Sequence, residues 1–515
     1  MARKGLKDEA ARSTVEISIP LLPVGEMADD KVQLMSQVVG NGSDSESSSV
    51  QLDTVNKLPW WSYIRGYDPA RTKEERQFLQ KLDLSLLTIL SLGYFIKNLD
   101  QTNISNTYVS GMKEALHMNS HELNLIDVAW TSGYVIGQVP SQFIFTKIRP
   151  STWIPSCELV WTLLTFSLAA ASSSNQVIGI RFLVGLVESI FYPAAHFLIG
   201  SWYTPSELGK RACIFHASSA VAGMFSRYLQ AAVYTGMNGT LGKEGWQWLF
   251  VMDGLFSLPI CIAGYFMIPD LPENTRAFYL TREDAFRARK RMAGVGRAPR
   301  GKLSWGVLQR VFSSWRIHAL TGLYVVFLNL GPGGSVNPLA LWLKERGWSV
   351  SWVNIIPTGQ SAVQLVTTIG FAILSDYLRN RPLVMVPRYS HLHLPIHLEY
   401  PPLLIYTSFF LVRASVAFGP LAMSWANEIC AADAEERAIV LGVMNASAYV
   451  VNIQEGIQVE CVSGCARGRN YRVHLVGGEG KGPEEKKRRK KRKRKRKRGR
   501  EANRECVNSG GGGPV

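Results

Sequence analysis

Long apolar runs alternate with short polar connections along this chain of 515 residues. Four of the runs, Val128–Thr146, Leu159–Ile180, Ile317–Leu343 and Gly347–Ser375, contain no Asp, Glu, Lys or Arg. About 18 apolar residues make a helix long enough to cross the hydrocarbon core of a bilayer. The pattern therefore predicts an all-α polytopic membrane protein, and it excludes both a soluble enzyme and a single-pass protein.

Ten apolar segments are expected to span the membrane. An eleventh, interrupted segment lies between the eighth and ninth of them. The ten lie at about Leu82–Leu99, Leu123–Phe145, Trp153–Ala171, Val177–Ser201, Ala212–Tyr234, Gln247–Ile268, Ile317–Leu343, Ser351–Leu374, Leu403–Cys430 and Ala438–Ile453. The segment that begins at Pro382 is interrupted by Arg388–Pro402, which is too polar and Pro-rich for a helix facing lipid. The last segment is short and no twelfth follows, so the second half is expected to be incomplete, with 10 to 11 spans in all.

These segments divide the chain into five regions. Residues 1–80 form a polar tail that we expect to be disordered in the cytosol, and 81–268 form a six-helix half. Residues 269–316 form a basic cytosolic loop with 11 Lys and Arg against 4 Asp and Glu. Residues 317–453 form the incomplete second half, and the Gly-rich, basic tail 454–515 is expected to be disordered.

Basic residues occur mainly in alternate connections. The connections on the side of the N-terminus carry 20 Lys and Arg, whereas those on the other side carry four: Lys113, Lys243, Lys344 and Arg346. Basic connections stay in the cytosol, so the N-terminus and the long loop are expected there. The sequence Asn238-Gly239-Thr240 then lies outside, where an Asn-linked glycan can be added. The sequence leaves its occupancy open.

Much of the net charge of +17 comes from the C-terminal tail. Residues 454–515 hold 19 Lys and Arg against 7 Asp and Glu, and 486–498 are thirteen consecutive basic residues. Such a run can adhere to RNA or to anionic lipid, but it lacks interleaved aromatic residues and offers no base readout. No specific nucleic-acid partner is expected. Seven scattered cysteines and the absence of a catalytic or nucleotide-binding motif predict no metal, no cofactor and no enzymatic activity.

Several motifs resemble those of a known transporter family. They are Leu99-Asp-Gln-Thr-Asn-Ile-Ser-Asn106, Gly133-Tyr-Val-Ile-Gly-Gln-Val-Pro-Ser141, Arg181-Phe-Leu-Val-Gly-Leu-Val-Glu188 and Ser375-Asp-Tyr-Leu-Arg379. Over about residues 65 to 453 the chain resembles the fungal anion:cation symporter branch of the major facilitator superfamily, which includes allantoate-permease-like proteins. Within that branch, the Asp-Gln-Thr-Asn sequence is most similar to the pantothenate transporters.

The resemblance implies a fold, a location and an activity. Two six-helix halves would pack around a central cavity that opens alternately to either side of the plasma membrane. A monomer would import a small organic anion together with a proton. Pantothenate is the first candidate substrate, and allantoate, nicotinate and biotin are the alternatives.

Ionisable side chains within the spans are the candidate functional residues, since each costs about 2.5 to 3.5 kcal/mol at the bilayer centre. The substrate-binding candidates, on spans that line the cavity in this family, are Lys97, Asp100, Gln101, Asn103, Arg181, Glu188 and Asn329. Lys97 or Arg181 could bind a carboxylate, and Asp100 or Glu188 could carry the proton. Alternatively, Lys97 with Asp100 and Arg181 with Glu188 are structural pairs within one helix face, or side chains at the membrane boundary.

Two further interpretations concern other parts of the chain. Asp376 and Arg379 resemble a short gating motif that closes the cytosolic side of the transporter. Glu158, Arg227 and Asp253 are expected to form structural pairs. A competing hypothesis is that the chain transports nothing, because a retained intron or a shifted frame near Pro387–Pro402 and again after Ile453 disrupts its second half.

Overall fold

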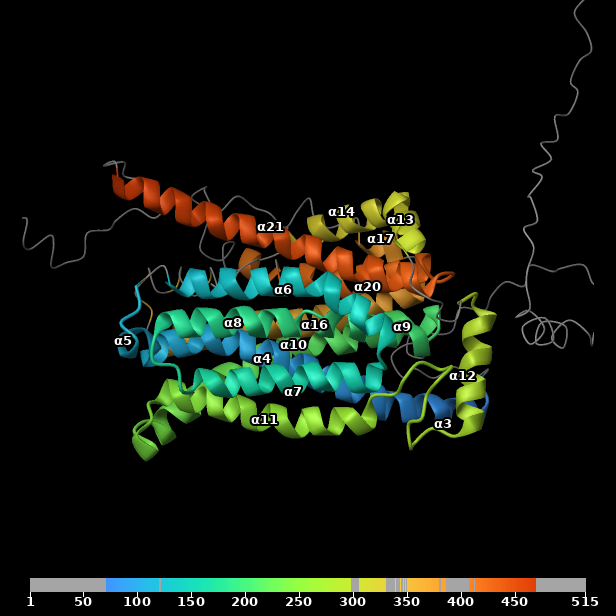
Figure 1. Cartoon of the computed structure of the whole chain (residues 1–515), viewed down its shortest axis with the longest axis horizontal. Helices are drawn as coiled ribbons and strands as arrows, with labels where there is room; N and C mark the ends of the chain where they lie inside the picture. Colours follow the sequence, from blue (N-terminus) through green and yellow to red (C-terminus); the bar gives the residue numbers. More distant parts are fainter. Residues whose placement is uncertain are drawn as a thin grey trace, which may run out of the picture. The chain divides into compact units, whose positions relative to one another are not determined.

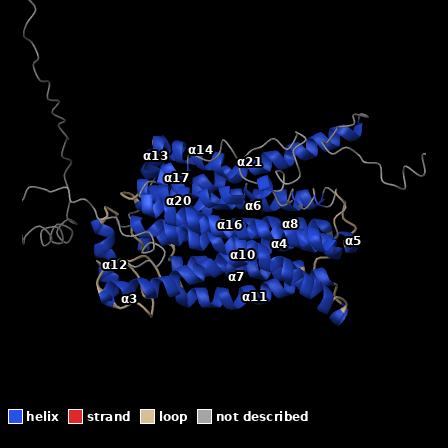
Figure 2. Cartoon of the chain, turned by 180° about the vertical axis from the view of Figure 1, so that it is seen from behind, coloured by secondary structure: helices blue, strands red, loops and turns tan. Residues whose placement is uncertain are grey.

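The computed structural model describes residues 71–119, 122–297, 305–329, 350–378, 381–385, 407–411 and 413–468, with single residues at 339, 343, 346 and 348. Every regular element in these ranges is a helix, which confirms the expected all-α class (Figure 2). Residues 1–70 of the predicted N-terminal tail, the segment Arg388–Pro402 and the run of basic residues at 486–498 lie outside the described residues. The expectation that the tail is disordered up to residue 80 is wrong for its last part, because Lys73–Leu82 is a helix whose apolar side chains Phe78, Leu79 and Leu82 are buried.

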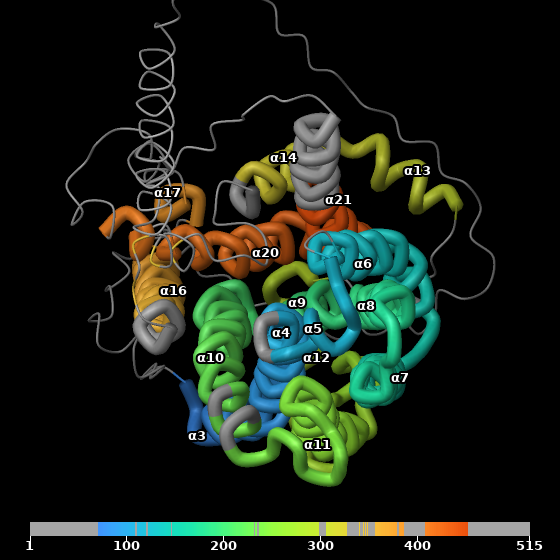
Figure 3. The backbone as a smooth tube through the Cα atoms, turned by 90° about the vertical axis from the view of Figure 1, so that its left-hand side faces the viewer, coloured from blue at the N-terminus to red at the C-terminus, as the bar shows by residue number. Residues whose placement is uncertain are grey.

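The first six apolar segments all form helices. In chain order the helices of this half are α3 (Lys73–Leu82), which continues through a π-helical turn into α4 (Thr88–Thr107), then α6 (Glu122–Lys147), α7 (Pro150–Leu168), α8 (Ser174–Glu188), α9 (Phe191–Trp202), α10 (Pro205–Met237) and α11 (Gly245–Met267). In the end view of Figure 3, α7, α8, α10 and α11 surround α4. Helix α4 therefore lies in the interior of this half.

The second half contributes fewer described helices. They are α14 (Trp315–Asn329), α16 (Val350–Leu378), the short α17 (Arg381–Met385), α20 (Phe418–Ile429) and α21 (Ala434–Gly468). Helix α16 packs along α10, and α21 packs along α6 and α14. Helix α21 continues beyond Ile453, where the sequence predicted the last span to end. No proline interrupts residues 454–468, so the backbone chemistry of that segment allows the helix to continue.

Among the described residues, five helical segments are long and apolar enough to cross a membrane. They are Lys73–Thr107, Ser174–Trp202, Gly245–Met267, Ile356–Leu378 and Thr407–Ile429. Three of them belong to the first half and two to the second. This distribution fits a bundle embedded in the membrane.

The basic loop between the halves contains two helices, α12 (Arg282–Gly294) and α13 (Trp305–Ser313). Helix α12 lies near α3 at one end of the bundle, called here the α12 end (Figure 1). Lys81 of α3 pairs with Asp284 of α12 at 2.8 Å, and Arg291 of α12 pairs with Glu207 of α10 at 2.5 Å. Burial alone would raise the pKa of Asp284, but hydrogen bonds from Lys81 and Thr281 lower it overall. The loop is therefore fastened to the first half.

Helices α6 and α8 approach each other at backbone distance. A Cβ atom on Gly133 would lie 2.1 Å from the Phe182 carbonyl oxygen, and one on Gly185 would lie 2.1 Å from the Trp130 carbonyl oxygen. Both obstacles are backbone atoms, which cannot rotate away. Small residues at such crossings allow close packing of membrane helices. The contact sets the position of Trp130 relative to α8.

The predicted span Val177–Ser201 is divided in two, because α8 ends at Glu188 and α9 begins at Phe191. Pro193 explains the break, since proline has no N–H and its ring clashes with the carbonyl four residues earlier. That carbonyl belongs to Ser189, and it accepts a hydrogen bond from Gln138 Nε2 of α6 at 3.1 Å instead.

We expect Gly185→Ala to destabilise the protein by about 1–3 kcal/mol, because the added methyl group meets a backbone oxygen that cannot move. Melting of the purified protein in detergent, followed by loss of the monodisperse species, measures the effect as a fall of several degrees. Gly179→Ala on the same helix is the matched control, since nothing lies within 4 Å of the added atom. Equal melting temperatures for the two variants would contradict close packing of α6 and α8.

Candidate functional site

Four charged candidates from the sequence meet in the interior of the first half. Lys97 and Asp100 lie on α4, and Arg181 and Glu188 lie on α8. Their exposed fractions are 2%, 1%, 1% and 0%, respectively. A cluster of buried charges of both signs inside a membrane protein needs internal pairing, water or a ligand.

Arg181 and Asp100 form an ion pair between the two helices. Arg181 Nη1 lies 2.8 Å from Asp100 Oδ2, and Thr165 Oγ1 of α7 donates to Asp100 Oδ1 at 3.3 Å. The structural alternative drawn from the sequence supposed pairs within each helix. The structure instead pairs the charges of Arg181 and Asp100 across two helices. Arg181 and Glu188 are two helical turns apart, about 10 Å along the axis, and they form no ion pair in the described structure.

Lys97 is surrounded by aromatic rings. Its Nζ atom lies 4.6 Å from the ring centroid of Tyr134, 5.5 Å from that of Trp130 and 6.0 Å from that of Tyr94. An ammonium group is attracted to the face of such rings. Within the described part of the chain, no carboxylate oxygen lies within ion-pair distance of this nitrogen.

Glu188 is held by neutral donors. Its Oε2 atom accepts hydrogen bonds from Trp130 Nε1 at 3.0 Å and from Gln101 Nε2 at 3.4 Å. Its Oε1 atom has no hydrogen-bond partner. Trp130 therefore contacts both the lysine and the glutamate. The cluster contains one cation and one acid without an ion-pair partner.

Sequence reasoning missed the aromatic part of this cluster. Trp130 and Tyr134 are four residues apart in a charge-free run, so they share a helix face, but that spacing is also common in hydrophobic cores. The structure adds Tyr449 of α21, whose ring centroid lies 4.7 Å from that of Tyr134. Asn445 Nδ2 of α21 also donates to the Tyr134 hydroxyl at 3.0 Å. The second half therefore contributes to the site.

A third carboxylate lies beside the ion pair. Asp253 of α11 is completely buried, and its electrostatic neighbours include Asp100, Asn103 and Arg181. The sequence assigned Asp253 a structural role, because a single acid on the sixth span gave no sign of its neighbours. In the structure it belongs to the same interior cluster.

The remaining candidates lie in different surroundings. Asn103 Oδ1 accepts a hydrogen bond from Ser226 Oγ at 2.7 Å, which connects α4 to α10. Asn329 is the last residue of α14, and its side chain is outside the described residues, as is Arg379. These positions remain predictions.

A second charged cluster, called here the gate cluster, joins the two halves at the α12 end. It consists of Lys210, Asp376, Arg381 and Glu428. Asp376 Oδ2 accepts from the Lys210 backbone N–H at 3.1 Å, and Arg381 Nη1 lies 3.7 Å from Asp376 Oδ1. Arg381 also binds Glu428 through Nε at 2.9 Å and Nη2 at 2.6 Å. In the described structure the side-chain cation paired with Asp376 is thus Arg381, whereas the motif in the sequence pointed to Arg379.

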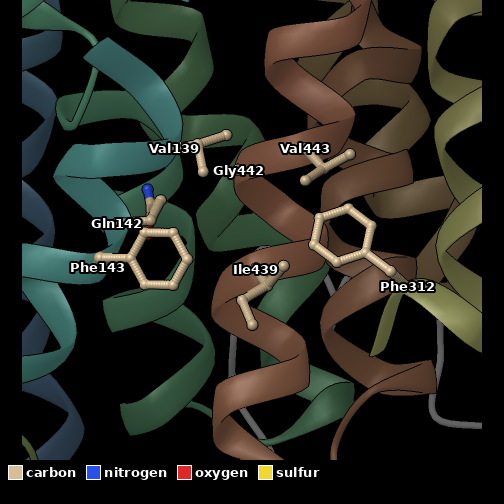
Figure 4. A pocket seen from close by; sticks show the side chains of 7 residues that line it. All are labelled: Val139, Gln142, Phe143, Phe312, Ile439, Gly442 and Val443. Atoms are coloured by element: carbon tan, nitrogen blue, oxygen red, sulfur yellow. The ribbon is translucent and has the colours of Figure 1, made fainter. Parts of the chain in front are cut away.

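A pocket between α6, α13 and α21 is almost entirely apolar. Figure 4 shows side chains of α6 facing those of α21, with Phe312 of α13 beside them; the lining residues are Val139, Gln142, Phe143, Phe312, Ile439, Gly442 and Val443. It offers no charge to an ionic ligand. Among the described residues, no group of three or more His, Cys, Asp or Glu could hold a metal ion. The interior charge cluster is therefore the candidate site.

A bundle of apolar helices around an interior cluster of charges is the arrangement of a membrane transporter. The sequence matches the Major Facilitator Superfamily over residues 90–453, and the chain belongs to that superfamily of transporters.

Individual relatives agree with this assignment. The chain is 32% identical to the MFS transporter PfmaC of Pestalotiopsis fici, over 88% of this chain and 90% of that protein. It is 34% identical to the pantothenate transporter liz1 of Schizosaccharomyces pombe, over 72% and 74% of the two chains. It is 32% identical to the pantothenate transporter FEN2 of Saccharomyces cerevisiae, over 74% and 77%.

The fold agrees with a solved structure. The proton:xylose symporter XylE, bound to 6-bromo-6-deoxy-D-glucose, superposes with a TM-score of 0.59 at 13% identity and covers 74% of this chain and 89% of that chain. At this identity the likeness concerns the fold alone.

Arg381→Gln is expected to open the α12 end, because it leaves Asp376 and Glu428 without their shared cation. Cys213 of α10 is fully buried beside this cluster and can report the change. In a variant that keeps Cys213 as its one cysteine, alkylation by N-ethylmaleimide should become at least several-fold faster. Arg289→Gln, an exposed position on α12, is the control. An unchanged rate in Arg381→Gln would show that the gate cluster does not hold this end closed.

Proposed function

We propose that the protein imports a small organic carboxylate together with a proton, and that pantothenate is the substrate. The observation that carries the proposal is Lys97, a buried ammonium group among aromatic rings with no carboxylate at ion-pair distance in the described chain. The pantothenate transporters of two yeasts, to which the chain is similar over most of its length, support the choice of substrate.

The substrate carboxylate would pair with the Lys97 ammonium group. A charge-assisted hydrogen bond is stronger in such a site than in water, because the surrounding rings exclude solvent. The apolar part of the substrate would pack against Trp130 and Tyr134. Tyr449 from the second half would cover the bound anion, which connects substrate binding to the movement of the two halves.

Glu188 is the better candidate for the proton. Asp100 is already paired with Arg181 and accepts from Thr165, whereas Glu188 has neutral donors on one oxygen and none on the other. Protonation of Glu188 would remove a negative charge beside Lys97 and leave the lysine to the substrate. One anion and one proton would then cross together without net charge.

We place the transporter in the plasma membrane, as the family resemblance implies for an importer. We place its N-terminus in the cytosol, because basic residues concentrate at the α12 end. The gate cluster would then close the cytosolic side while the site faces outward. Rupture of its ion pairs would open the site to the cytosol in an alternating-access cycle.

Lys97→Gln should reduce uptake of radiolabelled pantothenate by about tenfold or more, because a hydrogen bond to a charged group is lost. Uptake is measured in a yeast strain without its own pantothenate transporter. Lys97→Arg should keep part of the activity, and Lys113→Gln, near the other end of the bundle, should keep all of it. Competition by unlabelled biotin, nicotinate or allantoate tests the alternative substrates. Full uptake by Lys97→Gln would refute the assignment of the carboxylate site.

Glu188→Gln should abolish accumulation of pantothenate against a gradient but preserve exchange across the membrane, since an amide cannot release a proton. Uptake by the unmodified protein should rise as external pH falls, and the variant should lose this dependence. Glu114→Gln, an exposed acid, is the matched control. A variant that retains the pH dependence would exclude Glu188 as the proton carrier and favour Asp100 or Asp253.

A further inference from the structure

Two buried arginines at the α12 end have no acid at ion-pair distance among the residues that the structure describes. Arg297 follows α12 and is 7% exposed, and Arg437 lies in the first turns of α21 and is 3% exposed. Arg437 Nη2 donates to Ser201 Oγ of α9 at 2.9 Å, but its Nε and Nη1 atoms have no hydrogen-bond partner. None of the three side-chain nitrogens of Arg297 has a partner.

Three glutamates act electrostatically on these arginines: Glu428 on Arg297, and Glu273 and Glu435 on Arg437. None of them lies within ion-pair distance of either arginine in the described residues, and Glu428 is already bound by Arg381 at 2.6 Å. Burial lowers the pKa of Arg297 to about 10, so the side chain remains charged near neutral pH. Each arginine is a source of repulsion for the other. Arg437 gains some compensation from the ring of Phe197, whose centroid lies 4.5 Å from its Cζ atom.

An amide oxygen without a partner lies beside the arginines. Asn427 Nδ2 of α20 donates to the carbonyl oxygens of His196 and Met423, which fixes the orientation of the amide and leaves Oδ1 unpaired. Gly200 of α9 adjoins both groups, because a Cβ atom there would lie 2.2 Å from Asn427 Oδ1 and 3.3 Å from Arg297 Nη1.

These atoms match the chemistry of a phosphate group. Guanidinium N–H donors in a planar fork bind phosphate oxygens bidentately. A singly protonated phosphate also has one O–H group, which can donate a hydrogen bond to the Asn427 Oδ1 atom. Sulfate carries the same charge at neutral pH but has no such donor. Five buried N–H-bearing nitrogens without partners cost several hydrogen bonds unless an anion satisfies them.

We propose that Arg297, Arg437 and Asn427 bind a phosphate group, from free phosphate or from a lipid headgroup, at the α12 end. The ligand touches elements of both halves, because Gly200 and Ser201 belong to α9 whereas Asn427 and Arg437 belong to α20 and α21. Binding in this arrangement favours the state in which the α12 end is closed, since opening separates the ligands of the phosphate. The site is separate from the interior cluster and does not depend on the transported substrate.

The test is the melting temperature of the purified full chain in detergent, titrated with inorganic phosphate, sulfate or chloride at constant ionic strength. Phosphate should raise the melting temperature by several degrees and saturate, and it should slow alkylation of Cys213. Sulfate should act more weakly and chloride not at all. Arg297→Gln should weaken the response to phosphate by about tenfold or more. Arg289→Gln, which removes an exposed charge from the same basic segment, should respond as the unmodified protein does.

A second arm separates the two sources of phosphate. The protein is placed in phosphatidylcholine nanodiscs with and without phosphatidic acid. Stabilisation by phosphatidic acid that Arg297→Gln loses, without an effect of inorganic phosphate, identifies a lipid headgroup, and the reverse identifies the free ion. The proposal is overturned if neither phosphate source stabilises the protein. The same follows if sulfate and chloride raise the melting temperature as much as phosphate does, or if Arg297→Gln keeps the full response. It is also overturned if Arg297→Gln raises the melting temperature equally with and without phosphate, which would mark simple repulsion.

Discussion

The ion pair between Arg181 and Asp100 is the interaction on which the interior of the first half depends. Both residues are almost completely buried, and loss of either would leave an uncompensated charge in a medium that solvates charge poorly. The pair therefore fixes α4 against α8, and Thr165 adds α7 to the same contact. Because Arg181 and Asp100 satisfy each other, only two of the four charged candidates of the interior cluster are left to interact with a ligand. Lys97 and Glu188, which both contact Trp130, are left without an ion-pair partner among the described residues.

Charges at the α12 end serve a different purpose. Basic residues of the connection between the halves pair with acids on other elements: Arg287 with Glu74 of α3, Arg291 with Glu207 of α10, and Arg310 with Asp433 between α20 and α21. The pairs of Arg287 and Arg310 are partly exposed and each contributes little, whereas the pair of Arg291 with Glu207 is nearly buried. Together the three pairs determine where the connection lies. The excess of basic residues that indicates membrane orientation thus also binds the connection to both halves.

The sequence was sufficient to predict the long apolar helices of the first half, because a bilayer imposes a minimum length of uncharged residues that can be read directly. It did not predict the break at Pro193, the two helices of the basic loop or the continuation of α21 beyond Ile453. The sequence identified Lys97, Asp100, Arg181 and Glu188 as members of one interior group. It could not predict their partners, since spacing along one helix shows which residues share a face but not how neighbouring helices cross. The neighbours of Asp253, and the positions of Tyr449, Arg297 and Arg437, were missed for that reason.

Pro193 leaves one backbone bond missing between α8 and α9, and the Ser189 carbonyl turns sideways to Gln138. Bending at this point therefore meets less resistance than in a continuous helix, because one axial main-chain bond is already missing. Glu188 lies on one side of the joint, and Ser201, which Arg437 contacts, lies on the other. The fourth span consequently consists of two helical pieces, and the piece at the α12 end can tilt while the piece that carries Glu188 stays still.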